Sequence, residues 1–494
     1  MKTGIKKAQN LNYRRNQKLS YRREFPKETD QAPTKPFQDA PGDDEANWDS
    51  RKVIAVAKQG FPVFLGTVFL ISLLLPMRIR LGPLLLFPYR LWLLLLFIPL
   101  LIALLRGKAG PVAFVDWCFF GAAIWAVVSL LANHPLGVII EPAGAHTIEF
   151  LGAYLLGRIT IRSAEDFHRM VRIFFMIVLV LLPFALLEGL LHRPVLLQLI
   201  GQNGVAVDIG TRMGLRRAQT AFEHPILFGS FVSAGLGLVW YSYAYNRSAM
   251  RRLFGTFVIG LSTMLSLSSG ALMAFAMQTV FIAWEWVLKS YKRRWAIFGW
   301  GAAAVYVLID LFTTASPFHV LVRYATFSMQ SSYNRILIWH YGTQNIWDNP
   351  LFGLGLNDWV RPRWMSASVD NFWLLIALRY GIPFFILVTG ALVLLIWRMS
   401  RAQMPDPADR AARAAFLTTF GGVALAAGTV HYWNGVFSFI MFLIGSSIWM
   451  ISGGLSQSSN SDQSIETDHR KSRRAAGLKF GDVTNARSNN RPKT

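Results

Sequence analysis

The chain has 494 residues, a mean hydropathy of +0.36, 53% hydrophobic residues and 16% charged residues, a balance that soluble chains of this length rarely show. The formal net charge of +23 would suit a nucleic-acid-binding protein, but the first 23 and the last 42 residues each hold eight Lys and Arg residues. Basic tails beside long apolar segments reflect membrane topology, so we expect no nucleic-acid partner.

Both ends of the chain differ from its centre. Residues 1–52 mix charged and polar residues with few apolar ones, which predicts a disordered, basic cytoplasmic tail without a cleavable signal peptide. Residues 453–494 predict a second cytoplasmic tail of the same kind. The one cysteine, Cys118, excludes an internal disulfide and a cysteine-based metal site.

Between the tails, twelve apolar segments approach the ~20 residues that a helix needs to cross a bilayer. The sequence therefore predicts an all-α, polytopic membrane protein. Nine segments fall within residues 53–313 and three within 372–452, separated by one large periplasmic loop at 314–371. The predicted spans are 61–77, 82–104, 112–132, 137–158, 170–191, 225–244, 252–268, 270–288, 294–313, 372–398, 412–430 and 432–452.

Lysine sets the expected orientation. With the basic N-terminus inside, the predicted inner loops carry lysine and arginine, whereas the predicted outer loops contain no lysine. This positive-inside pattern supports an even number of spans, with both termini in the cytoplasm. The outer loops nevertheless hold ten arginines, which topology disfavours: Arg78, Arg80, Arg193, Arg212, Arg216, Arg217, Arg323, Arg335, Arg361 and Arg363. A guanidinium offers a two-pronged contact to phosphate oxygens, so some of these arginines are expected to bind an anionic group.

The first long outer loop, residues 192–224, ends in a polar motif that enters the membrane. Arg216 and Arg217 are followed by Glu223, His224 and Pro225, where a predicted span begins. Glu223 and His224 fit two interpretations equally: proton acceptors, or residues that stabilise a helix N-terminus whose first turn holds a proline.

The second long outer loop, residues 314–371, predicts two short helices at about 333–346 and 354–362. The first contains Arg335 and His340 and reads as an amphipathic helix on the membrane interface. A turn is expected at Gly353-Leu354-Gly355. Asp370 lies where the chain returns to the membrane and fits a functional carboxylate or an N-cap. The following span contains Gly381-Ile382-Pro383, so its first turns are expected to form a separate half-helix.

Over roughly residues 60–450, the chain resembles the O-antigen ligase and O-antigen polymerase superfamily of multispanning, GT-C-like glycosyltransferases. The resemblance is carried by Phe222-Glu223-His224-Pro225 after the arginines, the polar break at 266–270, Arg335 followed by Asn349-Pro350-Leu351-Phe352-Gly353-Leu354-Gly355, and Asp370-Asn371 with Gly381-Ile382-Pro383. Two positions depart from the family pattern. Ser268-Ser269-Gly270 stands where the family often has Ser-Arg-Gly, and Asp370-Asn371 stands where it usually has His-Asn.

The resemblance implies metal-independent, inverting glycosyl transfer from an undecaprenyl-diphosphate-linked glycan at the periplasmic face of a bacterial inner membrane. No cofactor is implied, and chain-length or export proteins would be further partners. Arg216, Arg217 and Arg335 would hold the diphosphate, and Asp370 or His224 would accept the proton of the attacking hydroxyl. The supporting residues would be Arg212, Glu223 and His340.

Several functions remain open at this stage. A polymerase is favoured over a ligase that transfers the glycan to lipid A core, because Asp370 replaces the usual histidine. A transporter would show internal repeats or a line of charges across the membrane, neither of which is evident. A non-catalytic scaffold of the same pathway is the last alternative.

Overall fold

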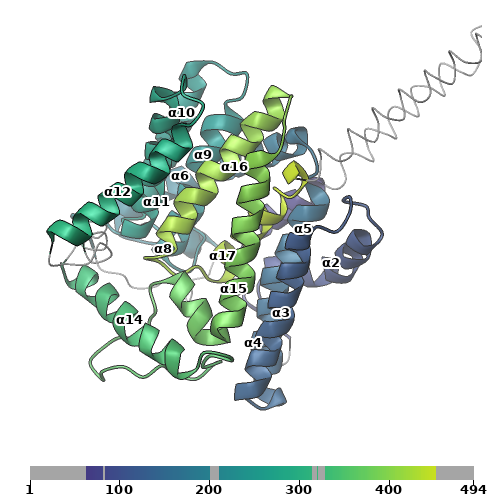
Figure 1. Cartoon of the computed structure of the whole chain (residues 1–494), viewed down its shortest axis with the longest axis vertical. Helices are drawn as coiled ribbons and strands as arrows, with labels where there is room; N and C mark the ends of the chain where they lie inside the picture. The colour runs from purple at the N-terminus through teal and green to yellow at the C-terminus, as the bar shows by residue number, and fades with distance from the viewer. Residues whose placement is uncertain (1–62, 82–83, 201–210, 314–319, 321–328, 452–494) are drawn as a thin grey trace, which may run out of the picture. The chain divides into compact units, whose positions relative to one another are not determined.

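The computed structural model describes residues 63–81, 84–200, 211–313, 320 and 329–451. The tails predicted at 1–52 and 453–494 and part of the predicted periplasmic loop therefore lie outside the described residues. The described chain is almost entirely helical, apart from a short antiparallel hairpin in which β1 (Ile79–Leu81) pairs with β2 (Leu84–Leu86) (Figure 1).

After a first helix, Val63–Ser72, the helices follow in chain order. They are α2 (Pro88–Leu105), α3 (Phe114–Asn133), α4 (Leu136–Thr147), α5 (Ala153–Thr160), α6 (Ala164–Leu191), α7 (Val195–Leu199), α8 (Pro225–Ser233), α9 (Gly235–Gly237), α10 (Ala249–Leu265), α11 (Ser269–Val287), α12 (Arg294–Phe312), α14 (Met329–Asp348), α15 (Phe372–Arg401), α16 (Pro407–Ala426) and α17 (Asn434–Gly445). Two π-helical turns, η1 (Ile148–Gly152) and η3 (Leu238–Tyr243), continue α4 into α5 and follow α9.

Every predicted span overlaps a helix, but not every one meets the requirements of a membrane-crossing helix. Within the described residues, eight helices are long and apolar enough to cross a bilayer. The remaining predicted spans correspond to Val63–Ser72, the α4–α5 segment, α10 and α16, which are helical but shorter or more polar. The chain is thus a helical membrane protein, and the count of twelve spans stays a prediction.

One predicted boundary and one predicted helix are wrong. The second span was expected from residue 82, but α2 begins only at Pro88, because residues 84–86 pair in the hairpin and proline suits a first helical turn. The short helix expected at 354–362 is an irregular loop. Asn345 of α14 holds this loop with both side-chain groups, since its Nδ2 donates to the Val360 carbonyl and its Oδ1 accepts from the Val360 amide.

Five of the charged residues inside the predicted spans, Arg90, Asp116, Glu149, Glu188 and Glu285, form buried or half-buried ion pairs. Unpaired charges would be costly at such depths, so pairing explains why these residues are tolerated. The pairs are Arg90–Glu149 at 2.7 Å, Asp116–Arg158 at 3.4 Å, Glu188–Arg216 at 3.7 Å and Glu285–Arg294 at 2.9 Å.

The loops separate into two groups that follow the predicted topology. On one side, the lysine-bearing loops meet, and Arg162 donates to the Lys108 carbonyl at 2.7 Å. On the other side, the predicted outer loops meet: Arg78 pairs with Glu223 at 3.0 Å, and the Leu356 amide donates to His134 Nε2 at 2.8 Å. We call this second side the arginine-rich face; it is formed by residues 78–81, 133–136, 211–224, 266–269, 349–371 and 427–433.

Helix α15 is broken near the arginine-rich face, as the sequence predicts. Gly381 has φ +80° and splits α15 into two helical parts. The turn at 349–355 docks on this break, because the Ile382 amide donates to the Pro350 carbonyl at 2.8 Å and the Leu354 amide donates to the Leu378 carbonyl at 2.8 Å. The two motifs, far apart in the sequence, therefore form one structural unit.

Candidate functional site

The polar break between α10 and α11, residues 266–269, organises the centre of the arginine-rich face. Leu267 adopts the left-handed conformation, with φ +46°, and turns the chain sharply between the helices. The Ala218 amide donates to the Leu265 carbonyl at 2.9 Å, which fixes the loop before α8 against the break. Two segments about 50 residues apart are thereby held together.

Three arginines converge on this break. Arg212 Nη1 donates to the Leu267 carbonyl at 3.0 Å, and Arg217 Nε donates to the Ser266 carbonyl at 3.4 Å. Arg335 arrives from α14, where its Nη2 donates to Ser269 Oγ at 3.3 Å. It belongs to the buried stripe of that helix, whose spacing is helical: Ser332, Arg335, Ile338, Gly342 and Asn345. We call Arg212, Arg217 and Arg335 the arginine cluster.

Two members of the cluster are buried, whereas Arg212 is exposed. Arg217 is 7% exposed and Arg335 is 9% exposed. Burial lowers the pKa of Arg217 to about 10, with a further contribution from the charge of Arg212, so the group stays cationic at neutral pH. Burial also lowers the pKa of Arg335, against the opposing effect of Asp370. Nε and Nη1 of Arg335 are buried without a hydrogen-bond partner in the described part of the chain.

Gln219, which follows the cluster's Arg217, adds further unsatisfied groups. Its side chain is fully buried, and both amide atoms lack a partner among the described residues. Buried polar groups are normally hydrogen-bonded, so these unsatisfied donors and acceptors make the loop a candidate for binding a polar ligand.

Arg216 is placed differently from its neighbour Arg217. Its Nε lies 3.7 Å from the carboxylate of Glu188, at the end of α6, and its amide donates to the Gly189 carbonyl. Glu188 also accepts from the backbone amides of Gln219 and Thr220. Arg216 therefore anchors the loop to α6, whereas Arg212, expected from the sequence as a supporting residue, contacts the break.

His224 is the N-cap of α8, and its Nδ1 accepts a hydrogen bond from the Ile226 amide at 3.1 Å. Burial lowers the His224 pKa to about 4, and Arg217 reinforces this effect, so the ring is neutral at pH 7. A neutral ring whose Nδ1 accepts must carry its proton on Nε2. No basic nitrogen is then available for an attacking hydroxyl, which favours the capping interpretation of His224.

Glu223 belongs to a hydrogen-bonded network. Its carboxylate pairs with Arg78 at 3.0 Å and accepts a hydrogen bond from Asn434 Nδ2. Asn434 Oδ1 in turn accepts from Arg90 at 3.0 Å, and Arg90 holds Glu149. The network joins the starts of α2, α8 and α17. A carboxylate committed in this way is suited to position the loop and not to act as a free base.

Asp370 is half-buried and does not cap α15. That role belongs to Asn371, whose side chain accepts from the Leu374 amide at 3.0 Å. The Asp370 carboxylate accepts from Ser368 Oγ at 2.7 Å, and its charge acts on both Arg335 and His224. Asp370 therefore lies beside the arginine cluster with lone pairs to spare, which favours the functional interpretation.

His340 does not join these residues. It is exposed on α14, where its Nε2 lies 3.3 Å from Gln344. Trp339 beside it is 42% exposed, in keeping with the interfacial helix expected from the sequence.

The sequence did not predict a groove next to Asp370. The groove consists of an outer cavity of about 320 Å³, beside residues 354–359 and 367–369, and an inner cavity of about 220 Å³, beside Arg90 and Glu149. The two cavities share four residues: Leu356, Leu375, Arg379 and His431. Arg379 comes from the first half of α15 and His431 from the turn before α17. Arg379 lies within a predicted span and His431 at the end of one. The two residues line the same cavities because α15 is broken at Gly381, and the composition of the chain does not show where that break directs the first half of the helix.

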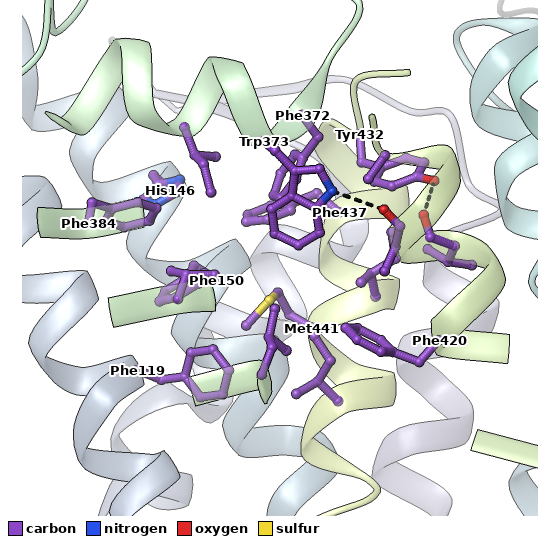
Figure 2. Close-up of a pocket in the computed structure, with 18 residues that line it drawn as sticks. Phe119, His146, Phe150, Phe372, Trp373, Phe384, Phe420, Tyr432, Phe437 and Met441 are labelled. Atoms are coloured by element: carbon purple, nitrogen blue, oxygen red, sulfur yellow. Dashed lines mark hydrogen bonds between the residues drawn. The ribbon is translucent and has the colours of Figure 1, made fainter. Parts of the chain in front are cut away.

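The inner cavity is continuous with an apolar pocket. His146, Phe372, Ile376, Tyr432 and Phe437 line both. Figure 2 shows aromatic side chains surrounding this pocket, with Trp373 donating to the Ala424 carbonyl and Tyr432 to the Val423 carbonyl. The groove thus passes from charged residues near the loops to aromatic residues within the helices.

No protein-family model matches the chain, and no curated protein matches it significantly. Any assignment of function therefore rests on the residues and geometry of the arginine-rich face.

Proposed function

We propose that the chain transfers a glycan from a polyprenyl-diphosphate carrier to an acceptor hydroxyl at its arginine-rich face, and that this face is periplasmic. One observation carries the proposal: Arg212, Arg217 and Arg335 converge from two segments on a single break, and Arg335 retains buried donor atoms without partners. The buried guanidinium groups of Arg217 and Arg335, with the exposed Arg212 beside them, suit a diphosphate, which offers several anionic oxygens to planar donors.

In the proposed reaction, the hydroxyl oxygen of the acceptor attacks the anomeric carbon as the bond from that carbon to the diphosphate oxygen breaks. The electron pair leaves with the polyprenyl diphosphate, whose growing negative charge the arginine cluster stabilises. Asp370 accepts the hydroxyl proton, a role that contributes roughly 10²–10⁴-fold in comparable reactions. Attack opposite the leaving group inverts the anomeric carbon.

The groove beside Asp370 supports this division of roles. Ser368, which donates to Asp370, also lines the outer cavity. The carboxylate is therefore near both the cationic cluster, which suits the leaving group, and a groove that can hold an acceptor. In an inverting displacement the base contacts the nucleophile on the face of the anomeric carbon opposite the leaving group, and an acceptor bound in the groove would present its hydroxyl to Asp370 from that side.

The test uses purified full-length protein in detergent with a polyprenyl-diphosphate-linked oligosaccharide. Arg217→Ala and Arg335→Ala should abolish transfer, while Arg193→Ala, at an exposed position, should leave it near the wild-type rate. Full activity in Arg217→Ala would refute the diphosphate role. Longer glycans identify a polymerase, which we favour, and transfer to lipid A core identifies a ligase. If neither product forms but the lipid-linked glycan crosses the membrane of vesicles that contain the protein, the protein is a transporter. If neither transfer nor transport is detected, the result points to a scaffold.

A further inference from the structure

The groove on the arginine-rich face combines aromatic and planar polar surfaces. Trp433 and Tyr380 supply rings, while Asn434 and the Arg90–Glu149 pair supply hydrogen-bonding groups with fixed orientation. Flat rings pack against the C–H faces of sugars, and oriented polar groups bind their hydroxyls. Sites of this composition, mostly apolar with few convergent polar groups, are typical of small-molecule binding.

Two hydrogen bonds hold the orientation of the Asn434 side chain. Its Nδ2 donates to Glu223, and its Oδ1 accepts from Arg90 at 3.0 Å. The backbone of Asn434 has φ +52°, a left-handed conformation that asparagine adopts more readily than other non-glycine residues. The amide at this end of the groove is therefore fixed in place.

The charge of the groove is not balanced. Glu149 is paired with Arg90, and Asp358 at the outer cavity is paired with Arg361 at 2.6 Å. None of the acids in the described ranges forms an ion pair with Arg379. Burial and the charge of Arg379 lower the His431 pKa to about 3, so this histidine is neutral. Arg379 thus leaves one positive charge at the junction of the two cavities.

The groove also communicates with the cluster through one side chain. The Trp433 ring lies 5.4 Å from that of His431 in the groove and 5.8 Å from that of His224 beside the cluster, measured between ring centroids. Trp433 therefore connects the groove with His224, on whose ring the charge of Asp370 acts.

We propose that the groove binds a glycan that carries a uronic acid, and that the sugar carboxylate pairs with Arg379. This inference rests on the proposed function, because it assigns the groove to the acceptor of the transfer reaction. The fork of a guanidinium matches the two oxygens of a carboxylate, and partial burial in a cavity reduces competition from water.

The first experiment requires no variant. Binding of a tetrasaccharide with one uronic acid to the purified protein is compared, by saturation-transfer NMR and calorimetry, with binding of its carboxyl-reduced, neutral counterpart. The acidic sugar should bind at least about tenfold more tightly, the equivalent of one charge-assisted hydrogen bond. Equal affinities would overturn the inference.

Variants then locate the site. Arg379→Gln should remove the preference for the acidic sugar, and Arg379→Lys should retain part of it because the charge remains without the fork. Arg363→Gln, in an exposed part of the loop, is the matched control and should retain the full preference. An undiminished preference in Arg379→Gln would refute the assignment to this groove.

Failure of this inference can be distinguished from failure of the proposed function. The saccharide-binding measurements use no lipid-linked donor, so they are independent of diphosphate recognition. If Arg217→Ala abolishes transfer while acidic and neutral sugars bind equally, the proposed transfer reaction is supported and the preference for a uronic acid is refuted. If the acidic sugar binds through Arg379 but Arg217→Ala transfers normally, the binding of acidic sugars in the groove is supported and the role of Arg217 in diphosphate binding is refuted.

Discussion

Nη2 of Arg335 lies 3.3 Å from Oγ of Ser269 and donates a hydrogen bond to it, which joins α14 to the first turn of α11. The O-antigen ligase and polymerase pattern that the sequence resembles often has arginine at the position of Ser269. The contact brings a guanidinium from α14 to Ser269, the position at which that pattern has an arginine on the break itself.

This relationship predicts a rescue. Arg335→Ser should abolish transfer, and adding Ser269→Arg should restore a measurable part of it, because a guanidinium returns to the same place from the other side of the contact. Ser269→Arg alone should reduce activity, since two cations would then compete for one buried position. Transfer rates of the three variants in detergent, at matched protein levels, test the prediction. No recovery in the double variant would mean that Arg335 acts through α14 and not through the position of its charge.

His224 predicts a pH dependence of stability. Its pKa in the folded protein is about 4, below the 6.5 of an unfolded histidine, because burial disfavours the charged ring. The unfolded chain therefore binds more protons between these values, and stability rises with pH through that window. The contribution is complete above about pH 6.5 and is lost as pH falls toward 4.

His224→Asn is the variant that isolates this effect. Asparagine can cap α8 but does not titrate, so the melting temperature should fall less between pH 7 and pH 4.5 than it does in the wild type. Thermal unfolding in lipid nanodiscs measures the difference. Parallel pH profiles in the two proteins would show that another group is responsible.

The sequence predicts the helical elements of this protein well, because length and apolarity are properties of single segments; the count of twelve spans and the side of the membrane that each face occupies stay predictions. The partners of individual arginines depend on folding. Arg216 and Arg217 are adjacent, yet one contacts Glu188 on α6 and the other contacts Ser266 at the break. Neighbouring residues in an extended loop point in opposite directions, and nothing local indicates which of the two meets which helix.

The groove was missed for a similar reason. Arg379 is visible in the sequence as a charge within a span, where interfacial placement or a buried pair is the usual explanation. Its role depends on His431, 52 residues later, and on the break at Gly381 that turns the first half of α15 toward it. The motif Gly381-Ile382-Pro383 was the available signal for the break, but it did not identify the residues that the break brings together.

The Glu223 network predicts a loss of stability that is separate from donor binding. Glu223→Ala leaves Arg78 and Asn434 without their shared carboxylate, and the partly buried Asn434 amide loses its partner. We expect destabilisation of about 1–3 kcal/mol, reduced by the exposure of Arg78. Thermal unfolding in nanodiscs measures it, with Glu165→Ala as the control. Glu165 forms an exposed pair with Arg169 one helical turn away, so its loss should cost less than about 0.5 kcal/mol. Equal effects of the two changes would contradict a structural role for the network.

Gly381 predicts a large effect of a single added methyl group. Its φ of +80° is unfavourable for alanine, and an added Cβ would overlap the Leu351 carbonyl oxygen of the docked turn. Gly381→Ala should therefore cost at least about 2 kcal/mol and release residues 349–355 from α15. Gly390→Ala, in the same helix with open space around the added Cβ, should be neutral or slightly stabilising. Hydrogen exchange at residues 350–356 and the melting temperature report the two effects together. Because the break also sets the position of Arg379, Gly381→Ala protein that remains folded should lose acidic-sugar binding along with protection of the turn; a folded variant that retains both would show that the break does not shape the groove.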